Sequence, residues 1–386
     1  MNRPLAILAG SILFLAGPVR AAEPPTYILV DEDSGRVLKE ENSAALWHPA
    51  SLTKLMTAYL TFEALRDGKL RMTSPVRVSA HALAQAPAKM GFKVGTVINV
   101  DNALKMMLVK SANDIAIAVA ETVGGSEENF VAEMNATAVR LGMASTHYDN
   151  ANGLPDDGQI TTARDLAVLA RAVLHDFPEY RSYFGIPAIR AGKRVLRSEN
   201  ALLERYRGTT GMKTGFVCAS GFNIVATAHR GTRDLIAVVL GAPSGAERTE
   251  FTAHLLDDGF NVFTAALAGM KPELASFEAA PTLGSPADLH DEICTRHPNV
   301  EEDAGDDNSA GDSAQSSALV PRFVLMAPVP VFTGHADPAL PGAGTAVAAA
   351  PPPAADAPQP VPVKASALGM PLPRLRPLLP GDTTAQ

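Results

Sequence analysis

Apolar residues recur at intervals of three and four along several stretches of the chain, and this spacing predicts amphipathic helices. The first stretch begins at Ser51 and continues to about Arg66, where Gly68 supplies a stop signal. Two threonines, Thr161 and Thr162, stand where a later helix needs a cap. In all, the spacing predicts helices over residues 51–66, 101–122, 127–141, 163–175 and 247–263.

Runs rich in β-branched and aromatic residues lie near both ends of this region and predict two β-hairpins. The first covers residues 26–40, where YILV and RVLKE flank the turn sequence DEDSG. The second pairs FNIVATA at 222–228 with LIAVVL at 235–240, on either side of HRGTRD. This order of elements predicts an α+β fold, in which both hairpins share one antiparallel sheet and the helices pack on it.

The two ends of the chain differ in composition from the region between them. Residues 1–22 combine an early arginine, a short apolar run and small residues, which predicts a secretory signal; an uncleaved anchor is the alternative. Residues 264–386 are rich in Pro and Ala, with 15 of the 30 prolines in the last 66 positions, and we expect most of this tail to be disordered. Within it, the apolar stretch 321–332 is a candidate for docking on the body. We therefore expect one ordered domain over residues 24–263, in a protein exported to the periplasm or cell envelope.

Charge and composition exclude several classes of partner. The net charge is −8 and the basic residues are scattered, whereas binding to nucleic acid needs a concentrated basic face. After the signal, no segment reaches the roughly 18 apolar residues of a transmembrane helix, so we expect no integral membrane segment in the mature chain. The nine histidines are dispersed and lack a metal-ligand spacing such as H-E-x-x-H, so we expect neither a metal nor another cofactor.

The start of the first predicted helix carries a hydroxyl and an amine on one face. Ser51 and Lys54 are three positions apart, so on a helix the lysine amine reaches the serine hydroxyl. A serine needs a base to act as a nucleophile, and lysine is that base only where its surroundings favour the neutral amine. The simpler interpretation is a helix cap followed by a solvated lysine. This S-x-x-K is nevertheless the only one in the chain.

Two further fragments add candidate groups. KSAND carries Ser111, a possible proton relay, and Asn113, a possible ligand for a substrate carbonyl; ordinary helix caps are the alternative, and residues 198–200 also match S-x-N. MKTGF carries Lys213 and Thr214, a cation and a hydroxyl suited to a carboxylate, at the entry to a strand, where a solvated lysine is the alternative. The order S-x-x-K, S-x-N and K-T-G is that of penicillin-binding proteins and serine β-lactamases.

Around these motifs the sequence resembles the serine-type D-alanyl-D-alanine carboxypeptidases, the low-molecular-mass penicillin-binding proteins of peptidase family S11. The resemblance covers about residues 24–263 and includes PASLTKLMTAYL, LVKSANDIAIAVAE, the stretch from FVAEMNA to LAVLA, GMKTGF and LIAVVLGAPSGAER. It implies a transpeptidase-like, β-lactamase-like domain. It also implies an enzyme that removes the terminal D-Ala from peptidoglycan stem pentapeptides through an acyl-enzyme and binds β-lactam antibiotics as pseudo-substrates.

The resemblance also implies a role for each motif residue. Ser51 would be the acylated nucleophile, Lys54 its base and Ser111 the proton relay. The oxyanion hole would be formed by the backbone N–H groups of Ser51 and Phe216. The substrate-binding residues would be Asn113, Lys213, Thr214, Gly215, Phe216 and Arg248, the last of which would assist binding of the terminal carboxylate.

The C-terminal sequence departs from the pattern of the family, and one cysteine lies beside a family motif. Many relatives have a β-rich second domain and end in an amphipathic membrane helix, but here the prolines in PLPRLRPLLPGDTTAQ forbid a continuous helix. Cys218 lies close to the K-T-G motif, so a disulfide with Cys294 would rigidify the wall of the site. Two buried free thiols are the alternative for these cysteines.

Three other functions stay open at this point. A class A-like β-lactamase shares the motifs but needs a carboxylate for deacylation, and DNANGLPDDGQITT offers only Asp156 and Asp157, which are more simply turn formers. A D,D-endopeptidase acting on cross-links would use the same residues. A silent penicillin-sensing or peptidoglycan-binding protein would keep the motifs without assembled geometry.

Overall fold

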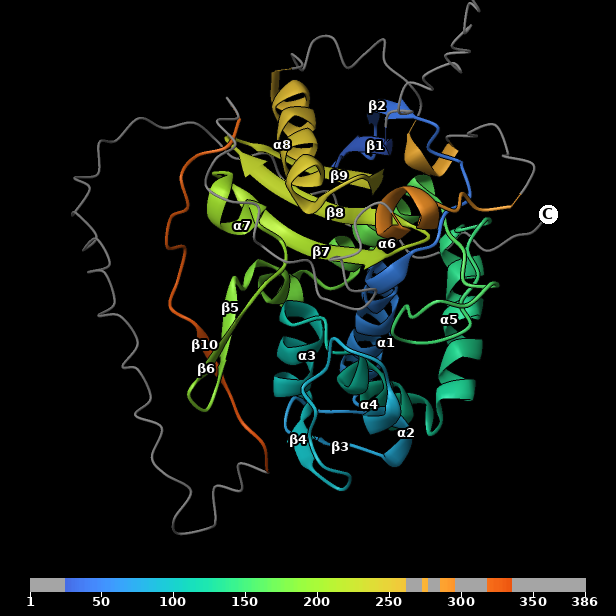
Figure 1. The fold of residues 1–386 in the computed structure, drawn as a ribbon, viewed down its shortest axis with the longest axis vertical. Helices are drawn as coiled ribbons and strands as arrows, with labels where there is room; N and C mark the ends of the chain where they lie inside the picture. Colours follow the sequence, from blue (N-terminus) through green and yellow to red (C-terminus); the bar gives the residue numbers. More distant parts are fainter. Residues whose placement is uncertain (1–24, 262–272, 277–284, 296–317, 335–386) are drawn as a thin grey trace, which may run out of the picture. The chain divides into compact units, whose positions relative to one another are not determined.

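The computed structural model describes residues 25–261, 273–276, 285–295 and 318–334. Its central element is a five-stranded antiparallel sheet with strand order β2-β1-β9-β8-β7 (Figure 1). These strands are β1 (Thr26–Asp31), β2 (Val37–Glu41), β7 (Thr209–Val217), β8 (Gly221–Arg230) and β9 (Arg233–Ala242). Both predicted hairpins are confirmed, and they meet where β1 pairs with β9, so the predicted α+β class is correct.

Helices cover both faces of this sheet because its side chains alternate between two apolar clusters. Val30 and Val238 face α6, whereas the neighbouring Leu29 and Val239 face α8. The helices are α1 (Lys54–Arg66), α2 (Ala80–Ala84), α3 (Val100–Val109), α4 (Asn113–Gly124), α5 (Glu127–Leu141), α6 (Ala163–Asp176), α7 (Leu202–Arg205) and α8 (Gly245–Asn261). None of the helices in the described residues is long and apolar enough to cross a membrane.

Most helix predictions are confirmed, with two corrections. Ser51 does not begin the first α-helix; it lies in a 3₁₀ turn (Ala50–Thr53) that leads into α1. The predicted helix over 101–122 is two helices, because Ser111 between them has a φ of +62°, which an α-helix does not accommodate. Thr162 caps α6 by accepting a hydrogen bond from the backbone N–H of Asp165.

Short strands that were not predicted complete the body. A two-stranded sheet joins β3 (Pro75–Arg77) to β4 (Val97–Asn99), and a hairpin of β5 (Ala188–Ala191) and β6 (Arg194–Arg197) lies beside α3. Their three- and four-residue lengths give too few alternating positions for a recognisable period.

Part of the tail lies on this body, as the apolar stretch 321–332 suggested. Strand β10 (Val329–Val331) pairs in parallel with β5, which makes a three-stranded sheet of order β10-β5-β6. The backbone N–H of Phe323 donates to the carbonyl of Glu204. The predicted signal, residues 1–22, and most of 264–386 lie outside the described residues.

A disulfide between Cys218 and Cys294 ties another piece of the tail to the end of β7. It fixes residues 285–295 there, where Ile293 is buried beside Phe222 and the backbone N–H of Leu289 donates to the Ala219 carbonyl at 2.9 Å. Phe216 stacks on Phe222 with ring centroids 4.3 Å apart, so the cross-linked segment supports the strand that carries the K-T-G motif.

We expect removal of this disulfide to lower the free energy of unfolding by about 2–4 kcal/mol. The reason is that the disulfide restricts the unfolded chain by joining two residues with a sequence separation of 76. Urea unfolding of the Cys218→Ser, Cys294→Ser double variant measures the loss. A reductant should shift the midpoint of the wild type and leave that of the double variant unchanged. Equal midpoints for the two proteins without reductant would contradict the expected stabilisation.

Candidate active site

Ser51 and Lys54 lie in direct hydrogen-bond contact at the point where the 3₁₀ turn meets α1. Lys54 Nζ is 2.7 Å from Ser51 Oγ, 2.7 Å from Asn113 Oδ1 and 2.6 Å from the Asn152 carbonyl oxygen. The lysine side chain is fully buried, at 0% exposure, whereas Ser51 is partly exposed. The pair therefore keeps its amine in the protein interior, next to a serine that is partly exposed.

Two glycines hold the turn that carries Ser51 in place. Ala50 has a φ of +48°, which is unusual for a residue with a side chain. Gly153, with a φ of +88°, packs so closely that a Cβ built on it would lie 1.9 Å from the Ala50 carbonyl oxygen. A Cβ on Gly215 would lie 3.0 Å from the backbone nitrogen of Ser51. The loop at 153 and strand β7 thus approach the turn from two sides as only glycines allow.

The break between α3 and α4 places Asn113 beside Lys54. Asn113 is the first residue of α4; its backbone N–H donates to the Ala88 carbonyl and its side-chain amide donates to the Ala86 carbonyl. Its Oδ1 is thereby turned toward Lys54. Ser111 lies two residues earlier, buried, at the left-handed position that breaks the helix.

The predicted carboxylate-binding residues line strand β7 and the start of α8. Lys213 is buried, and its Nζ donates to the Thr214 carbonyl at 2.8 Å. Arg248 in α8 is buried, with Nη2 3.3 Å from the backbone carbonyl of Glu199. The Thr214 hydroxyl donates to Glu199 Oε2 at 3.4 Å. The Thr214 hydroxyl and the Arg248 guanidinium therefore both contact Glu199.

Glu199 is a residue of this site that the sequence interpretation missed. It is buried, and its Oε1 lies 3.9 Å from Lys110 Nζ in addition to the Thr214 contact. Residues 198–200 drew notice only as a second S-x-N match, and no spacing relates Glu199 to the other motifs. A carboxylate next to a predicted carboxylate-binding pair gives the site an extra negative charge.

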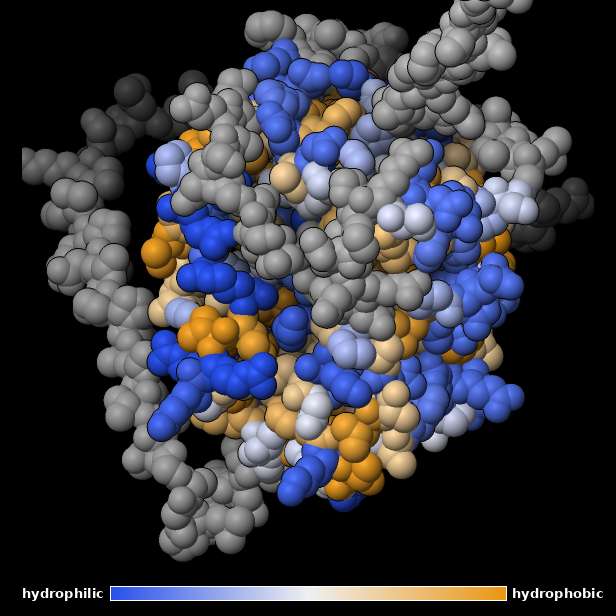
Figure 2. Space-filling model, viewed as in Figure 1, coloured by the Kyte–Doolittle hydropathy of each residue, from blue (hydrophilic) through white to orange (hydrophobic). Residues whose placement is uncertain are grey.

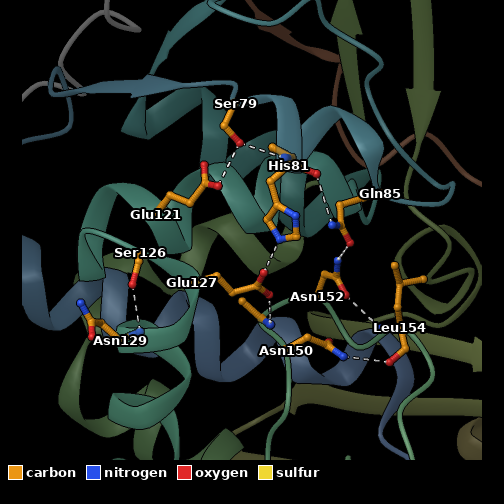
Figure 3. Close-up of polar contacts among 12 residues, drawn as sticks. Ser79, His81, Gln85, Glu121, Ser126, Glu127, Asn129, Asn150, Asn152 and Leu154 are labelled. Atoms are coloured by element: carbon orange, nitrogen blue, oxygen red, sulfur yellow. Dashed lines mark hydrogen bonds and ion pairs between the residues drawn. The ribbon is translucent and has the colours of Figure 1, made fainter.

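Asn152 is a second missed residue, since it acts on Lys54 through its backbone carbonyl. Its side chain is held on both ends: Nδ2 donates to Gln85 Oε1 at 2.8 Å, and Oδ1 accepts from the Leu154 N–H at 2.9 Å (Figure 3). Glu127 fixes the same loop, because one of its oxygens accepts from the Ala151 N–H and the other contacts the His81 ring at 2.6 Å. Residues from α2, α5 and this loop thus jointly orient the carbonyl that Lys54 contacts.

The carboxylates of the neighbouring loop behave as turn residues. Asp156 and Asp157 are exposed, and Asp156 accepts hydrogen bonds from the backbone N–H groups of Gly158 and Gln159. Burial, followed by the nearby Asp156 carboxylate, raises the pKa of Asp149, and the His147 imidazole opposes this. In the described part of the chain, no group of three or more His, Cys, Asp or Glu side chains is arranged to hold a metal ion.

The contacts of Lys54 determine how a neutral amine would be oriented at this position. A neutral amine has two N–H donors and one lone pair. Among the groups that contact it, Asn113 Oδ1 and the Asn152 carbonyl can only accept, whereas the Ser51 hydroxyl can also donate. A neutral Lys54 that donates to both of these acceptors would point its lone pair toward Ser51, which is the orientation a general base needs.

Comparison with known proteins identifies a family and several relatives of this chain. A family model described as D-alanyl-D-alanine carboxypeptidase matches residues 17–244. The D-alanyl-D-alanine carboxypeptidase DacC of Escherichia coli (strain K12) is 36% identical over 285 residues, which covers 69% of this chain and 71% of the relative. DacF of Bacillus subtilis (strain 168) is 34% identical over 248 residues, covering 63% and 64%. Part of each relative's length is thus left unmatched.

Solved structures show the same fold. The D-alanyl-D-alanine carboxypeptidase DacD from Francisella tularensis superposes with a TM-score of 0.60 at 28% identity, covering 66% of this chain and 74% of that one. Penicillin-binding protein D2 from Listeria monocytogenes, solved in an ampicillin-bound form, has a TM-score of 0.54 at 31% identity and covers 61% and 96%.

Proposed function

Because this chain belongs to the D-alanyl-D-alanine carboxypeptidase family, we propose that it removes the terminal D-Ala from peptidoglycan stem peptides through an ester on Ser51. The observation that carries the proposal is the 2.7 Å contact between Lys54 Nζ and Ser51 Oγ, with the amine buried against two acceptor-only oxygens.

In the acylation step, Ser51 Oγ attacks the carbonyl carbon of the penultimate D-Ala while Lys54 takes the hydroxyl proton. The C–N bond to the terminal D-Ala then breaks, and the leaving amine receives a proton through Ser111. Water hydrolyses the ester, with Lys54 as the general base, and regenerates Ser51.

The developing oxyanion requires two donors on one side of Ser51. We assign the backbone N–H groups of Ser51 and Phe216 to this role, because β7 passes so close to Ser51 that a Cβ built on Gly215 would lie 3.0 Å from the Ser51 nitrogen. Asn113 would bind the amide of the peptide substrate and would also keep its hydrogen bond with Lys54.

The terminal carboxylate of the substrate would bind Thr214, Lys213 and Arg248. Glu199 already accepts a hydrogen bond from Thr214 there, so its charge opposes that of the substrate. We expect Glu199→Gln to lower KM by about tenfold, equivalent to about 1.4 kcal/mol, with kcat little changed, because the amide keeps the hydrogen bond and removes the repulsion. Steady-state kinetics of D-Ala release measure the effect, with the exposed Glu179→Gln as the control. A raised KM would show instead that Glu199 orients the cations in favour of the substrate.

β-Lactams would acylate the same serine, since they place a reactive carbonyl beside a carboxylate, and the ampicillin-bound neighbour is a relative of similar fold. We further propose that the chain acts outside the cytoplasm, on the basis of the apolar N-terminal run in residues 1–22. Fractionation of cells that produce the full chain tests this location.

The decisive experiment offers the purified protein diacetyl-Lys-D-Ala-D-Ala and, separately, labelled benzylpenicillin. The proposal requires D-Ala release together with a penicilloyl adduct on the Ser51 peptide that persists on the time scale of the assay. Rapid penicillin turnover without D-Ala release would identify a β-lactamase. A penicilloyl adduct with neither D-Ala release nor penicillin turnover would identify a penicillin-sensing protein.

A further inference from the structure

Residues 80–88, which begin with α2, support both of the acceptor-only groups that contact the catalytic amine. The side-chain amide of Asn113 donates to the Ala86 carbonyl at 3.0 Å. The side-chain amide of Asn152 donates to Gln85 Oε1 at 2.8 Å. This segment therefore bears on the geometry of the base, although none of its residues takes part in the proposed chemistry.

A pair formed by His81 and Glu127 ties the same segment to the loop that carries Asn152. Figure 3 shows the His81 imidazole pointing toward the Glu127 carboxylate, and its Nε2 lies 2.6 Å from Oε2. The other carboxylate oxygen accepts a hydrogen bond from the Ala151 N–H at 3.1 Å. Ala151 directly precedes Asn152, so this hydrogen bond restricts the backbone that leads to the Asn152 carbonyl.

The hydrogen bonds between α2 and the loop form a closed ring. Asn152 donates to Gln85, and Gln85 Nε2 donates in turn to the His81 carbonyl at 3.3 Å. His81 is thus linked to the loop in two directions, through its side chain by way of Glu127 and through its backbone by way of Gln85. Because the members of such a network support one another, we expect the loop to shift when the ring is cut at one point.

His81 acts from the surface of the protein. Its side chain is 56% exposed and that of Glu127 is 18% exposed. Figure 2 shows a largely hydrophilic surface over α5, the helix that begins with Glu127. A solvated pair of this kind contributes little to the free energy of unfolding. Loss of the imidazole should therefore change the orientation of the loop far more than the stability of the fold.

We propose that His81 and Glu127 are positioning residues for the general base. They hold the loop so that the Asn152 carbonyl accepts one N–H of neutral Lys54, which leaves the lone pair directed at Ser51. This inference rests on the proposed function of Ser51. Without the pair, a smaller fraction of the protein has its lone pair in that direction. The effect falls on proton transfer in ester formation and in ester hydrolysis, and not on binding of the terminal carboxylate.

The test measures D-Ala release from diacetyl-Lys-D-Ala-D-Ala by variants of the full mature chain, with labelled penicillin used to count active sites. His81→Ala should lower kcat about tenfold and leave KM unchanged, because both chemical steps slow by the same factor. His81→Gln should recover most of the loss, since the glutamine amide can donate to Glu127 in place of the imidazole. The control is His254→Ala, which removes an exposed histidine that pairs with Glu250 on α8.

A double-mutant cycle tests whether His81 acts through Glu127. Glu127→Ala also removes the acceptor for the Ala151 N–H, so its kcat should fall about a hundredfold. Adding His81→Ala to this variant should then cause no further loss. Losses that multiply in the double variant would overturn the inference. It would also be overturned by an effect of His81→Ala on KM or melting temperature alone, or by a His81→Gln variant as slow as His81→Ala.

The rate of penicillin acylation reports on the same base without D-Ala release. A wild type that captures penicillin but releases no D-Ala would overturn the proposed function. The acylation rates of His81→Ala and His81→Gln would still test the positioning role in that case, and equal rates for wild type and both variants would overturn it. The same two variants decide the question if Glu127→Ala does not fold.

Discussion

Replacing Ser51 with Ala is expected to reduce D-Ala release by a factor of about 10⁴ or more and to abolish covalent capture of penicillin. The reason is that Ser51 Oγ is the atom on which the ester would form, and Lys54 offers it the base at 2.7 Å. The partly exposed hydroxyl contributes little packing, and Lys54 keeps its contacts with Asn113 and Asn152. The loss should therefore appear in kcat, with a normal circular dichroism spectrum and melting temperature.

Ser182→Ala is a suitable control, since Ser182 is exposed and lies outside the site. D-Ala is measured by an oxidase-coupled assay, and the penicillin adduct by mass spectrometry. Equal D-Ala release by wild type and Ser51→Ala would remove Ser51 from the mechanism, whatever the geometry around Lys54.

Gly153→Ala is expected to damage both stability and acylation, although Gly153 has no side chain to react. A Cβ there would lie 1.9 Å from the Ala50 carbonyl oxygen, and its φ of +88° is unfavourable for alanine. Either the loop or the turn that carries Ser51 has to move. We expect the free energy of unfolding to fall by about 3 kcal/mol or more and penicillin acylation to slow by at least about a hundredfold.

The control variant Gly95→Ala separates the effect of the unfavourable φ from the effect of the steric clash. Gly95 has a similar φ of +85° with nothing within 4 Å of an ideal Cβ, so this variant carries the backbone strain alone. It should cost about 1 kcal/mol and leave acylation unchanged. Urea unfolding and stopped-flow penicillin binding measure the two effects. Equal acylation rates for Gly153→Ala and wild type would show that the turn tolerates displacement.

The fold was predictable where a periodic pattern runs without interruption. Helices α5 and α6 and the β8–β9 hairpin were placed within a few residues, because apolar spacing and turn residues agree there. The break between α3 and α4 was not predicted, since apolar positions continue on both sides of Ser111 and the pattern holds no information on its φ. Strands of three or four residues, such as β3 and β5, are too short to show a period.

The site was predictable only as far as its chemistry lies in side chains with a motif. Ser51, Lys54 and Asn113 belong to such motifs, and in the structure Lys54 contacts both of the others. Asn152 acts through its carbonyl, which every residue has, so its type gave no signal. Glu199 reaches Thr214 only through tertiary contact across fifteen positions, which no local pattern encodes.

The contacts of the tail with the body determine where a recombinant fragment of this protein can end. Three residues of the tail are buried against the body. Leu274 lies in the apolar cluster that includes α6, Ile293 lies beside the cross-linked end of β7, and Val331 packs against the hairpin that contains β5. A recombinant fragment that stops at residue 263, where the helical pattern ends, would leave three apolar docking sites uncovered and Cys218 without its partner. The shortest fragment that retains these contacts and the hydrogen bond from the Gly334 N–H to the Val97 carbonyl extends through Gly334, so sequence periodicity alone would place the cloning boundary about seventy residues too early.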